Sequence, residues 1–331
     1  MQITNNMRRR FVKDTSLPIK VFNEAIFADR LRLLDKQFNT TEKWNQFVEI
    51  VDQFETELDF FEQYDYIRES VIDHLSNSDK LRYFAQDEDM SRFKIKNTGF
   101  PASGVFKDVH VGKFLLSIDM VKANFTALRH YDPEIFHGAK TYEEFIGMFT
   151  SYDYFTKSKY IRQFLFGNIA PKRTQKYEQY LMDKILEKIL NKTSIPYFKV
   201  LYFGSDEIVI DVTHLVERGE LDSQFAAQID SIVAGFCDEG INVRREYYKL
   251  VKIEGTTTGY IKQFVFDTAR TKQYEIKGAD SIEYPFVIRA LEDQMPTDND
   301  MYFLHEGRLA KLIEPIEIKF VETIGSEEPK E

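Results

Sequence analysis

A pair of apolar segments joined by an acidic turn constrains the fold of this chain more than any other feature of its sequence. Residues 197–203 and 208–212 are rich in β-branched and aromatic residues, and Gly-Ser-Asp-Glu at 204–207 separates them. This pattern predicts a β-hairpin with two carboxylates at its tip. Residues 113–119 form another apolar segment, which ends in Asp119 and predicts a buried strand.

The elements predicted around these strands indicate an α+β fold. Helical periodicity covers 171–191 and 221–238, and strand-like segments cover 243–253 and 260–266. The central order is therefore strand, helices, hairpin, helix and strand. This order suits an antiparallel sheet with helices packed on one face.

Three regions are expected along the chain. Residues 1–100 show a helical pattern that follows a loose basic tail at 1–10, and residues 105–255 hold the core of the predicted sheet. Residues 256–331 are rich in strand-like segments and end in an acidic tail. The first boundary rests on a loop at 97–104 that contains two glycines and a proline.

Composition narrows the class of protein. The chain has 331 residues, and its 29 Phe and 18 Tyr supply enough apolar surface to exclude disorder for most of its length. A single cysteine excludes an internal disulfide and a multi-cysteine zinc site. Because no signal peptide or apolar run of membrane-spanning length is found, we expect no membrane partner and no secretion. The expected location is the cytoplasm, that of a host cell or a virion if the protein is viral.

Three carboxylates stand at the ends of predicted strands, namely Asp119, Asp206 and Glu207. Burying a carboxylate among apolar residues is costly unless it is paired or bound to a metal. Their convergence at one edge of a sheet would suit Mg²⁺ or Mn²⁺, because Mg²⁺ takes oxygen ligands from carboxylates and phosphates. The structural alternative is that Asp206 and Glu207 are polar turn residues and Asp119 caps a helix.

Two basic segments stand out in a chain whose net charge is −10. The stretch 157–176 has no acidic residue, and it places Gly167 and Asn168 shortly before a helix whose N–H groups could face phosphate. The stretch 244–249 combines basic residues with tyrosines, a mixture that suits the backbone and bases of nucleic acid. Each segment could instead be a solvated surface or one side of a half-buried sheet.

The order of these segments resembles that of the motifs of right-hand nucleic-acid polymerases. Ser-Ile-Asp-Met-Val-Lys-Ala-Asn-Phe at 117–125 resembles motif A, residues 162–173 resemble motif B, and Tyr-Phe-Gly-Ser-Asp-Glu at 202–207 resembles motif C. Residues 244–249 and Ile-Lys-Gly-Ala-Asp at 276–280 are similar to segments that follow motif C in family B DNA polymerases. The compact spacing between motifs A and C resembles that of reverse transcriptases, and Ser-Asp-Glu is also similar to a sequence of tRNA-His guanylyltransferases.

The resemblance implies a palm-like sheet with a two-metal site. Asp119 and Asp206, with Glu207 beside them, would hold two Mg²⁺ ions, and the backbone carbonyl of Met120 would be a further ligand. Phe125 would exclude the ribose 2′-hydroxyl, although it stands one residue later than the family pattern places this aromatic residue.

The resemblance also implies substrate-binding residues. Basic side chains of the motif B segment would hold the triphosphate, and the strand after motif C would bind a primer or product strand. The residues concerned are Arg162, Gly167, Asn168, Lys172 and Arg173 for the triphosphate, and Arg244, Arg245, Tyr247 and Lys249 for the nucleic acid.

These expectations combine into a nucleotidyltransferase of viral or mobile-element type that adds nucleotides to a nucleic-acid 3′ end. Its partners would be a nucleoside triphosphate and a primer or template, and residues 1–100 would close the active site or bind a protein. One alternative is a palm that makes no polymer, such as a nucleotide cyclase or a tRNA-end transferase. Another is a non-enzymatic structural or interaction protein with a degenerate palm.

Other reactive residues are expected to have structural roles. His110, His130 and His137 lack the regular spacing of zinc ligands. Cys237 falls on the apolar face of a predicted helix, where it is expected to act as a small hydrophobic residue. Ser205 lacks the second glycine of a nucleophile elbow, which weighs against a hydrolase.

Overall fold

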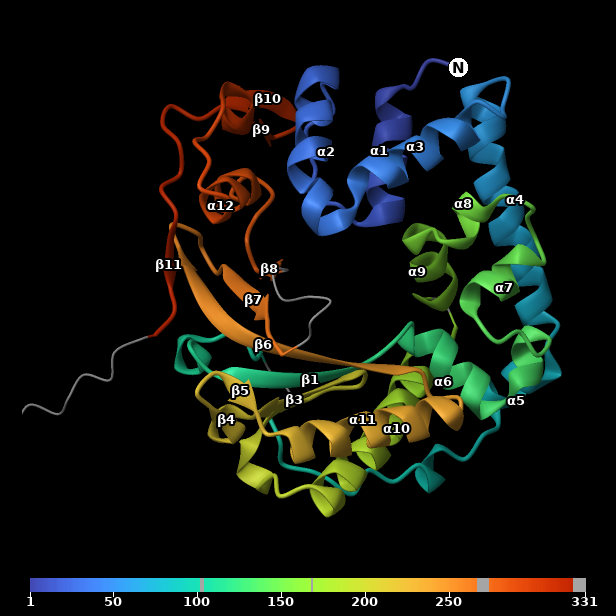
Figure 1. Ribbon diagram of the computed structural model, residues 1–331. Coiled ribbons are helices and arrows are strands. Elements are labelled where there is room, and N and C mark those ends of the chain that lie inside the picture. The colour runs from blue at the N-terminus through green and yellow to red at the C-terminus, as the bar shows by residue number, and fades with distance from the viewer. Residues whose placement is uncertain (102–103, 168, 267–273, 324–331) are drawn as a thin grey trace, which may run out of the picture.

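The computed structural model describes residues 1–101, 104–167, 169–266 and 274–323. It is an α+β fold with a helical N-terminal region and an antiparallel sheet, which confirms the fold class expected from the sequence (Figure 1). The expected acidic tail lies outside the described residues, as does Asn168.

The central sheet has seven strands in the order β2-β3-β1-β6-β7-β8, and β11 pairs with β6 outside this path. Its strands are β1 (Phe114–Met120), β2 (Val200–Phe203), β3 (Glu207–Asp211), β6 (Val243–Glu254), β7 (Tyr260–Phe264), β8 (Tyr274–Lys277) and β11 (Lys319–Val321). Because β7, β8 and β11 follow residue 255, the boundary expected there is wrong and cuts through the sheet.

The predicted acidic hairpin is confirmed as β2 and β3. The Gly204 N–H donates to the carbonyl oxygen of Glu207 at 2.9 Å and closes the turn. A Cβ atom at Gly204 would lie 2.4 Å from the hydroxyl oxygen of Tyr202, so a larger residue here would displace the Tyr202 side chain. The turn therefore holds its two acids at a fixed place beside the end of β1.

The two faces of the sheet have different partners, because successive side chains of a strand point to opposite sides. Leu116, Ile118 and Met120 face the helix side, where they belong to the main hydrophobic core. That core includes buried residues of α10 (Pro171–Lys192) and α11 (Ser223–Asp238), which run along this side of the sheet in Figure 1. We call this side the helix face.

The other side, which we call the acid face, carries Ser117, Asp119, Glu207, Arg244, Glu246, Lys262 and Glu275, which share one side by the strand register. A small core that includes Val105, Leu115 and Tyr248 covers part of this face. The charged residues lie toward the end of β1 that the hairpin turn adjoins. The acid face therefore combines a packed part and a charged part.

The N-terminal region is helical, as expected. Its helices are α1 (Asn5–Thr15), α2 (Glu24–Phe38), α3 (Thr40–Val51), α4 (Glu57–Ser76) and α5 (Asp79–Gln86). The expectation of a loose tail at 1–10 is wrong, because Thr4 caps α1 through its side chain, and Met7 and Phe11 are fully buried. Aromatic contacts fix α1 against α3, because the ring of Phe11 packs on those of Trp44 and Phe47.

Shorter helices connect the sheet strands and the C-terminal elements. They are α6 (Ala123–Tyr131), α7 (Tyr142–Gly147), α8 (Asp153–Thr156), α9 (Lys159–Gly167) and α12 (Tyr284–Leu291), and two small ribbons pair β4 (Val216–Glu217) with β5 (Glu220–Leu221) and β9 (Tyr302–His305) with β10 (Arg308–Lys311). Helix α12 lies in a region that was expected to be rich in strands.

The N-terminal helices bridge two parts of the chain that lie far apart in sequence. On one side, Arg30 of α2 forms a buried ion pair with Asp300 at 2.6 Å. On the other side, Asp14 of α1 accepts hydrogen bonds from Tyr154 of α8 at 2.8 Å and from Ser158, directly before α9, at 2.6 Å. In Figure 1 these contacts complete a ring of elements around a central space.

Candidate active site

Asp119 and Glu207 lie side by side at the charged end of the acid face. They are directly opposite each other in the register of β1 and β3, and Asp119 is opposite Arg244 in β6. The Met120 N–H donates to the carbonyl oxygen of Asp206 at 2.8 Å, which joins the end of β1 to the hairpin turn. The structure therefore pairs Asp119 with Glu207 and joins the backbone of Asp206 to the end of β1, close enough for the Asp206 charge to act on Asp119.

The carboxyl group of Asp119 is held in an unfavourable setting for a negative charge. Burial raises its pKa to about 6, and the neighbouring carboxylates of Glu207, Asp206 and Glu246 act in the same direction. The guanidinium of Arg244, whose Nη2 lies 2.9 Å from Oδ2 of Asp119, opposes this shift. The carboxylates around Asp119 therefore carry more negative charge than Arg244 alone can neutralise.

A buried lysine organises the carboxylates that adjoin Asp119. Nζ of Lys262 lies 3.5 Å from Glu246, 3.8 Å from Glu207 and 3.9 Å from Glu275. The hydroxyl of Ser117 donates to Oε1 of Glu207 at 2.6 Å. These contacts fix the Glu207 side chain toward the middle of the acid face.

Glu178 extends the acidic group toward the helix face. It lies on α10, and Nδ2 of Asn124 donates to its Oε1 at 2.6 Å. Burial raises the pKa of Glu178 to about 7, and the charge of Asp206 adds to the rise. Asp206 is therefore close to acids on both sides, Asp119 and Glu178.

The carboxylates at the end of β1 meet the needs of a divalent metal ion in part. Within the described residues, no group of three or more Asp, Glu, His or Cys side chains is arranged to hold a metal ion. Mg²⁺, however, is commonly bound by one or two carboxylates, with substrate phosphates and water as its other ligands. Asp119 with Asp206 or Glu207 fits this requirement in donor type and charge.

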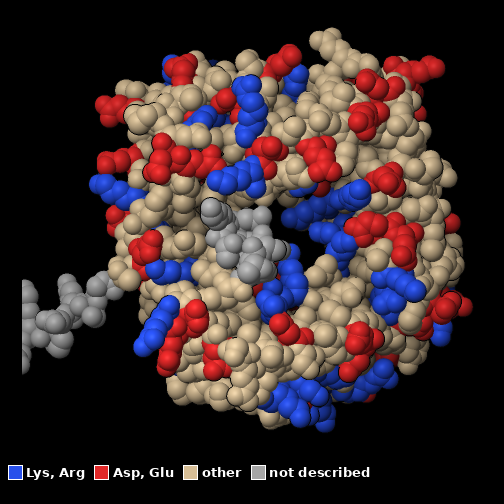
Figure 2. Space-filling model, viewed as in Figure 1, with Lys and Arg blue, Asp and Glu red and all other residues tan. Residues whose placement is uncertain are grey.

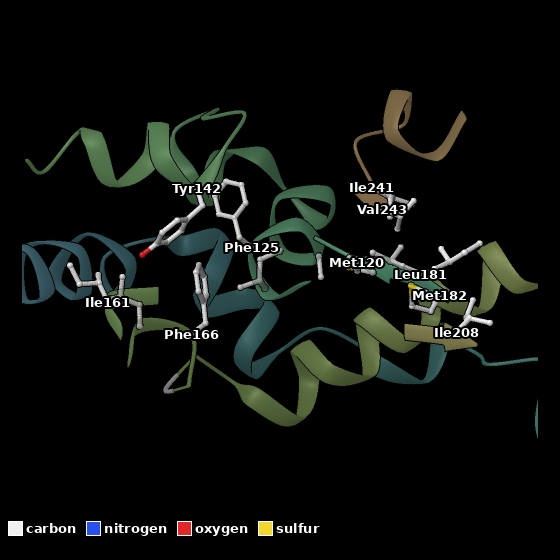
Figure 3. Close-up of a cluster of buried hydrophobic side chains, with 14 of the residues drawn as sticks. Met120, Phe125, Tyr142, Ile161, Phe166, Leu181, Met182, Ile208, Ile241 and Val243 are labelled. Carbon is white, nitrogen blue, oxygen red and sulfur yellow. The ribbon is translucent and has the colours of Figure 1, made fainter. Parts of the chain in front are cut away.

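Phe125 does not lie where a sugar-excluding residue must lie. Its side chain is 2 % exposed, and its ring centroid lies 4.6 Å from that of Phe136 and 6.1 Å from that of Tyr142. Figure 3 shows Phe125 among buried side chains, with Tyr142 and Phe166 beside it. The role expected for Phe125 is therefore corrected to packing in the core, because its position in α6 turns it inward.

The residues of the motif B segment lie in different surroundings, some at the start of α10 and others, including Arg162, on α9. The Arg173 guanidinium donates to the carbonyl oxygens of Phe84, Glu88 and Gln86 at 2.8–3.1 Å, so it caps the end of α5 rather than binding phosphate. Lys172 is the exposed neighbour of Arg173 on α10, and Gly167 ends α9. The residues between them, Ile169 and Ala170, line an apolar cavity of 670 Å³ beside α4 and α5. The expected phosphate site at the start of α10 is therefore not supported.

Arg162 is the one predicted triphosphate-binding cation that lies on α9. It lines a cavity together with Lys157 and Lys159. Figure 2 shows a hollow near the centre of this face of the molecule, with Lys and Arg side chains at the edge where α9 lies. Lys159 interacts electrostatically with Glu275 of β8, so the start of α9 faces the edge of the sheet. We call this hollow the central recess.

The four residues predicted to bind nucleic acid from β6 do not share a face. Arg244 lies on the acid face, whereas strand alternation directs Arg245, Tyr247 and Lys249 to the other side. Arg245 pairs with Asp230 of α11, Tyr247 is 3 % exposed, and Lys249 pairs with Glu322 at 2.6 Å. Of these four, only Arg244 remains a candidate for contact with a substrate at the acid face.

The histidines and the cysteine named in the sequence analysis make contacts typical of structural residues. His130 is hydrogen-bonded to the hydroxyl of Tyr177 at 2.9 Å, and the ring of His137 lies 4.1 Å from that of His74. Cys237 is half-buried, and its Sγ lies 3.5 Å from the carbonyl oxygen of Val243. These contacts agree with the structural roles expected for His130, His137 and Cys237.

The sequence analysis assigned no role to the buried acids Glu178 and Glu246, and it counted Lys262 in a basic cluster suited to nucleic acid rather than as a partner of these carboxylates. Glu178 lies among the polar residues of a helix, yet its side chain is only 4 % exposed. Lys262 is 5 % exposed and stands in a strand of alternating pattern, where an inward-facing lysine was the available signal.

Comparison of the chain with protein-family models, curated proteins and solved structures gives no match in any of the three. Among the helices of the described residues, none has both the length and the apolar content needed to cross a membrane.

Proposed function

We propose that the chain is a metal-dependent nucleotidyltransferase that adds nucleotides to a nucleic-acid 3′ end, with Asp119, Asp206 and Glu207 at its reacting centre. The observation that carries this proposal is the crowding of these carboxylates at the end of β1, where Asp119 has a pKa of about 6. A structural turn would not need such a costly arrangement. Carboxylates with perturbed pKa values are common at functional sites.

In the proposed reaction, the 3′-oxygen of a strand forms a bond to the α-phosphorus of a nucleoside triphosphate. The bond from that phosphorus to the bridging oxygen breaks, pyrophosphate leaves, and the hydroxyl proton is released. Divalent cations bound at these carboxylates would supply charge stabilisation for the attacking and leaving oxygens. Asp119 and Glu207 hold their carboxylates in one orientation through β-sheet pairing and through Ser117, so little reorganisation is needed.

Arg244 has a second role in this proposal. Its guanidinium neutralises Asp119 in the structure described, and it is half exposed. A substrate phosphate that approaches Asp119 offers the guanidinium a planar, doubly hydrogen-bonded partner. Arg244 would therefore release Asp119 to a metal ion as the substrate enters.

The test is extension of a labelled primer–template by the full chain with Mg²⁺ or Mn²⁺ and all four nucleotides of each sugar type. Asp119→Asn is expected to lower incorporation by roughly a thousandfold or more, because it removes charge stabilisation from the transition state. Asp238→Asn, which changes an exposed aspartate at the end of α11, is the matched control and should retain activity.

Two results would contradict the proposal. One is equal incorporation by the wild type and Asp119→Asn. The other is the absence of extension together with the absence of any thermal stabilisation by Mg²⁺ and a triphosphate, because a bound ligand must raise the melting temperature. Stabilisation without extension would instead favour a transferase that makes no polymer.

A further inference from the structure

A polar cavity of 410 Å³ lies between the N-terminal helices and the start of α9. Its walls come from the end of α1, the start of α3 and the segment from α8 to α9. Four cationic side chains line it, namely Lys43, Lys157, Lys159 and Arg162. We call it the cationic cavity.

The acids of the cationic cavity already have partners. Asp14 accepts hydrogen bonds from the hydroxyl groups of Tyr64, Tyr154 and Ser158. Glu42 accepts hydrogen bonds from the side-chain amide of Asn39 and from that of Gln46, the latter at 3.2 Å. Neither carboxylate forms an ion pair with a cavity cation.

The four cations lack such partners. Within the described residues, none of their side chains makes an ion pair or a hydrogen bond. With two acids and four cations, the cavity carries a net charge of +2. Burial lowers the pKa of Lys43, and burial together with the charges of Arg162 and Lys277 lowers that of Lys159. An unneutralised cluster of this kind is unfavourable unless an anion joins it.

We propose that the cationic cavity binds a terminal phosphate group. A phosphate monoester carries close to two negative charges at neutral pH and offers several strong acceptor oxygens. These properties match the net charge of the cavity and the planar fork of Arg162, which can bind two phosphate oxygens at once. The volume is at the lower end of that of small-molecule pockets, so it suits the end of a ligand rather than a duplex.

The position of the cavity indicates the source of the phosphate. Lys159 interacts with Glu275, and Glu275 lies 3.9 Å from Lys262, which in turn contacts Glu207. The cavity and the proposed reacting centre therefore belong to the two sides of the central recess. A terminal phosphate there could belong to the triphosphate tail of a nucleotide or to the 5′ end of a strand.

The first experiment measures binding of inorganic tripolyphosphate to the full chain by calorimetry, without metal. Lys43→Gln and Arg162→Gln are each expected to weaken binding by about tenfold, because each removes a charge-assisted contact. Lys188→Gln changes an exposed lysine of α10 and is the matched control. Because neither Lys43 nor Arg162 has a partner in the described residues, both variants should fold, which their melting temperatures will show.

The second experiment separates the two sources by fluorescence anisotropy with a labelled oligonucleotide. Tighter binding of the 5′-phosphorylated form than of the 5′-hydroxyl form, lost in Arg162→Gln, would support a strand end as the source. Equal binding of both forms, with retained tripolyphosphate binding, would support the nucleotide tail. Failure of the wild type to bind tripolyphosphate, or equal affinities for Lys43→Gln and Lys188→Gln, would overturn the proposal.

The proposal does not depend on the proposed reaction. Asp119→Asn leaves the cationic cavity unchanged, so this variant should bind tripolyphosphate as tightly as the wild type does. Inactive protein with intact phosphate binding would contradict the proposed function alone. If Arg162→Gln lost phosphate binding but retained primer extension, the cavity would bind phosphate without being needed for the proposed reaction.

Discussion

The two sides of the central recess differ in how their charges are satisfied. On the sheet side, Lys262 contacts three carboxylates and Arg244 pairs with Asp119. On the α9 side, Lys159 and Arg162 have no ion pair within the described residues. Charges that stabilise each other contribute to folding, whereas unpaired like charges oppose it. The charged residues of the sheet side therefore neutralise one another, whereas Lys159 and Arg162 have no ion-pair partner in the described part of the chain and are proposed to bind an anion.

The largest effect is expected on the sheet side, from replacing Lys262, the lysine that contacts its three carboxylates. Lys262→Met leaves Glu246, which is 7 % exposed, beside Glu207 without that cation. We expect a loss of about 3–5 kcal/mol in the free energy of unfolding, because a buried charge loses its partner. Urea denaturation at pH 7 measures the loss.

The control for Lys262→Met is the double variant with Glu246→Gln. Neutralising both partners removes the buried negative charge that Lys262 stabilises, so the double variant should be more stable than Lys262→Met alone. A single variant within 1 kcal/mol of the wild type would contradict the view that the sheet side is held by its ion pairs.

Glu178 gives the next largest effect, and it depends on pH. Its pKa is about 7 in the folded protein against 4.5 ordinarily, so the folded state binds the proton more tightly. The stability contributed by this group is complete below pH 4.5 and is lost as the pH rises to about 7. Glu178→Gln removes that loss and should stabilise the protein at pH 8 by on the order of 3 kcal/mol.

Unfolding curves at pH 5 and pH 8 test this expectation. Glu187→Gln, on the same helix, is the control, because Glu187 lies at the surface and pairs with Lys96. Its effect should be small at both values of pH. If Glu178→Gln gave no larger gain at pH 8 than at pH 5, the raised pKa of Glu178 would be contradicted.

The sequence predicted the sheet side better than the α9 side, for a physical reason. The strand ending in Asp119 and the turn at 204–207 follow from local periodicity and turn chemistry, and both are confirmed. Strand alternation could also have separated Arg244 from Arg245, since neighbouring residues of a strand face opposite sides. The prediction that Arg244, Arg245, Tyr247 and Lys249 all bind nucleic acid did not take this alternation into account.

Contacts between distant segments were beyond what local patterns can predict. Arg173 caps α5, and Lys43 joins the cationic cavity, through packing that depends on the complete fold. Phe125 illustrates the same limit, because a shift of one residue along a helix turns a side chain to another face. The boundary at 255 failed since β7 and β8 pair with β6 across it.

The α9 side predicts a smaller effect of opposite sign. Lys159→Gln removes a charge that repels Arg162 and Lys277, so we expect a gain of a few tenths of a kcal/mol at low salt. Added salt should shrink the gain, because ions screen exposed charges. Thermal unfolding at two salt concentrations measures it.

Lys36→Gln is the matched control for Lys159→Gln, because Lys36 pairs with Glu292 at 3.2 Å. This change should be neutral or slightly destabilising. A loss of stability in Lys159→Gln would show that Lys159 has a stabilising partner, and it would contradict the division of the recess into a satisfied side and an unsatisfied side.

The last expected effect, at Arg244, is a change in the pKa of Asp119 rather than in stability. Its side chain is 53 % exposed and pairs with Asp119, so Arg244→Gln should change stability by less than about 1 kcal/mol. The pKa of Asp119 should nevertheless rise further, because the cation that lowers it is gone. Carboxyl carbon NMR across pH 4 to 8 follows this titration directly. Arg245→Gln, on the helix face, should leave the pKa of Asp119 in place. Equal shifts in both variants would mean that the Arg244 contact does not set the charge of Asp119, and that the guanidinium has no part in admitting a metal ion.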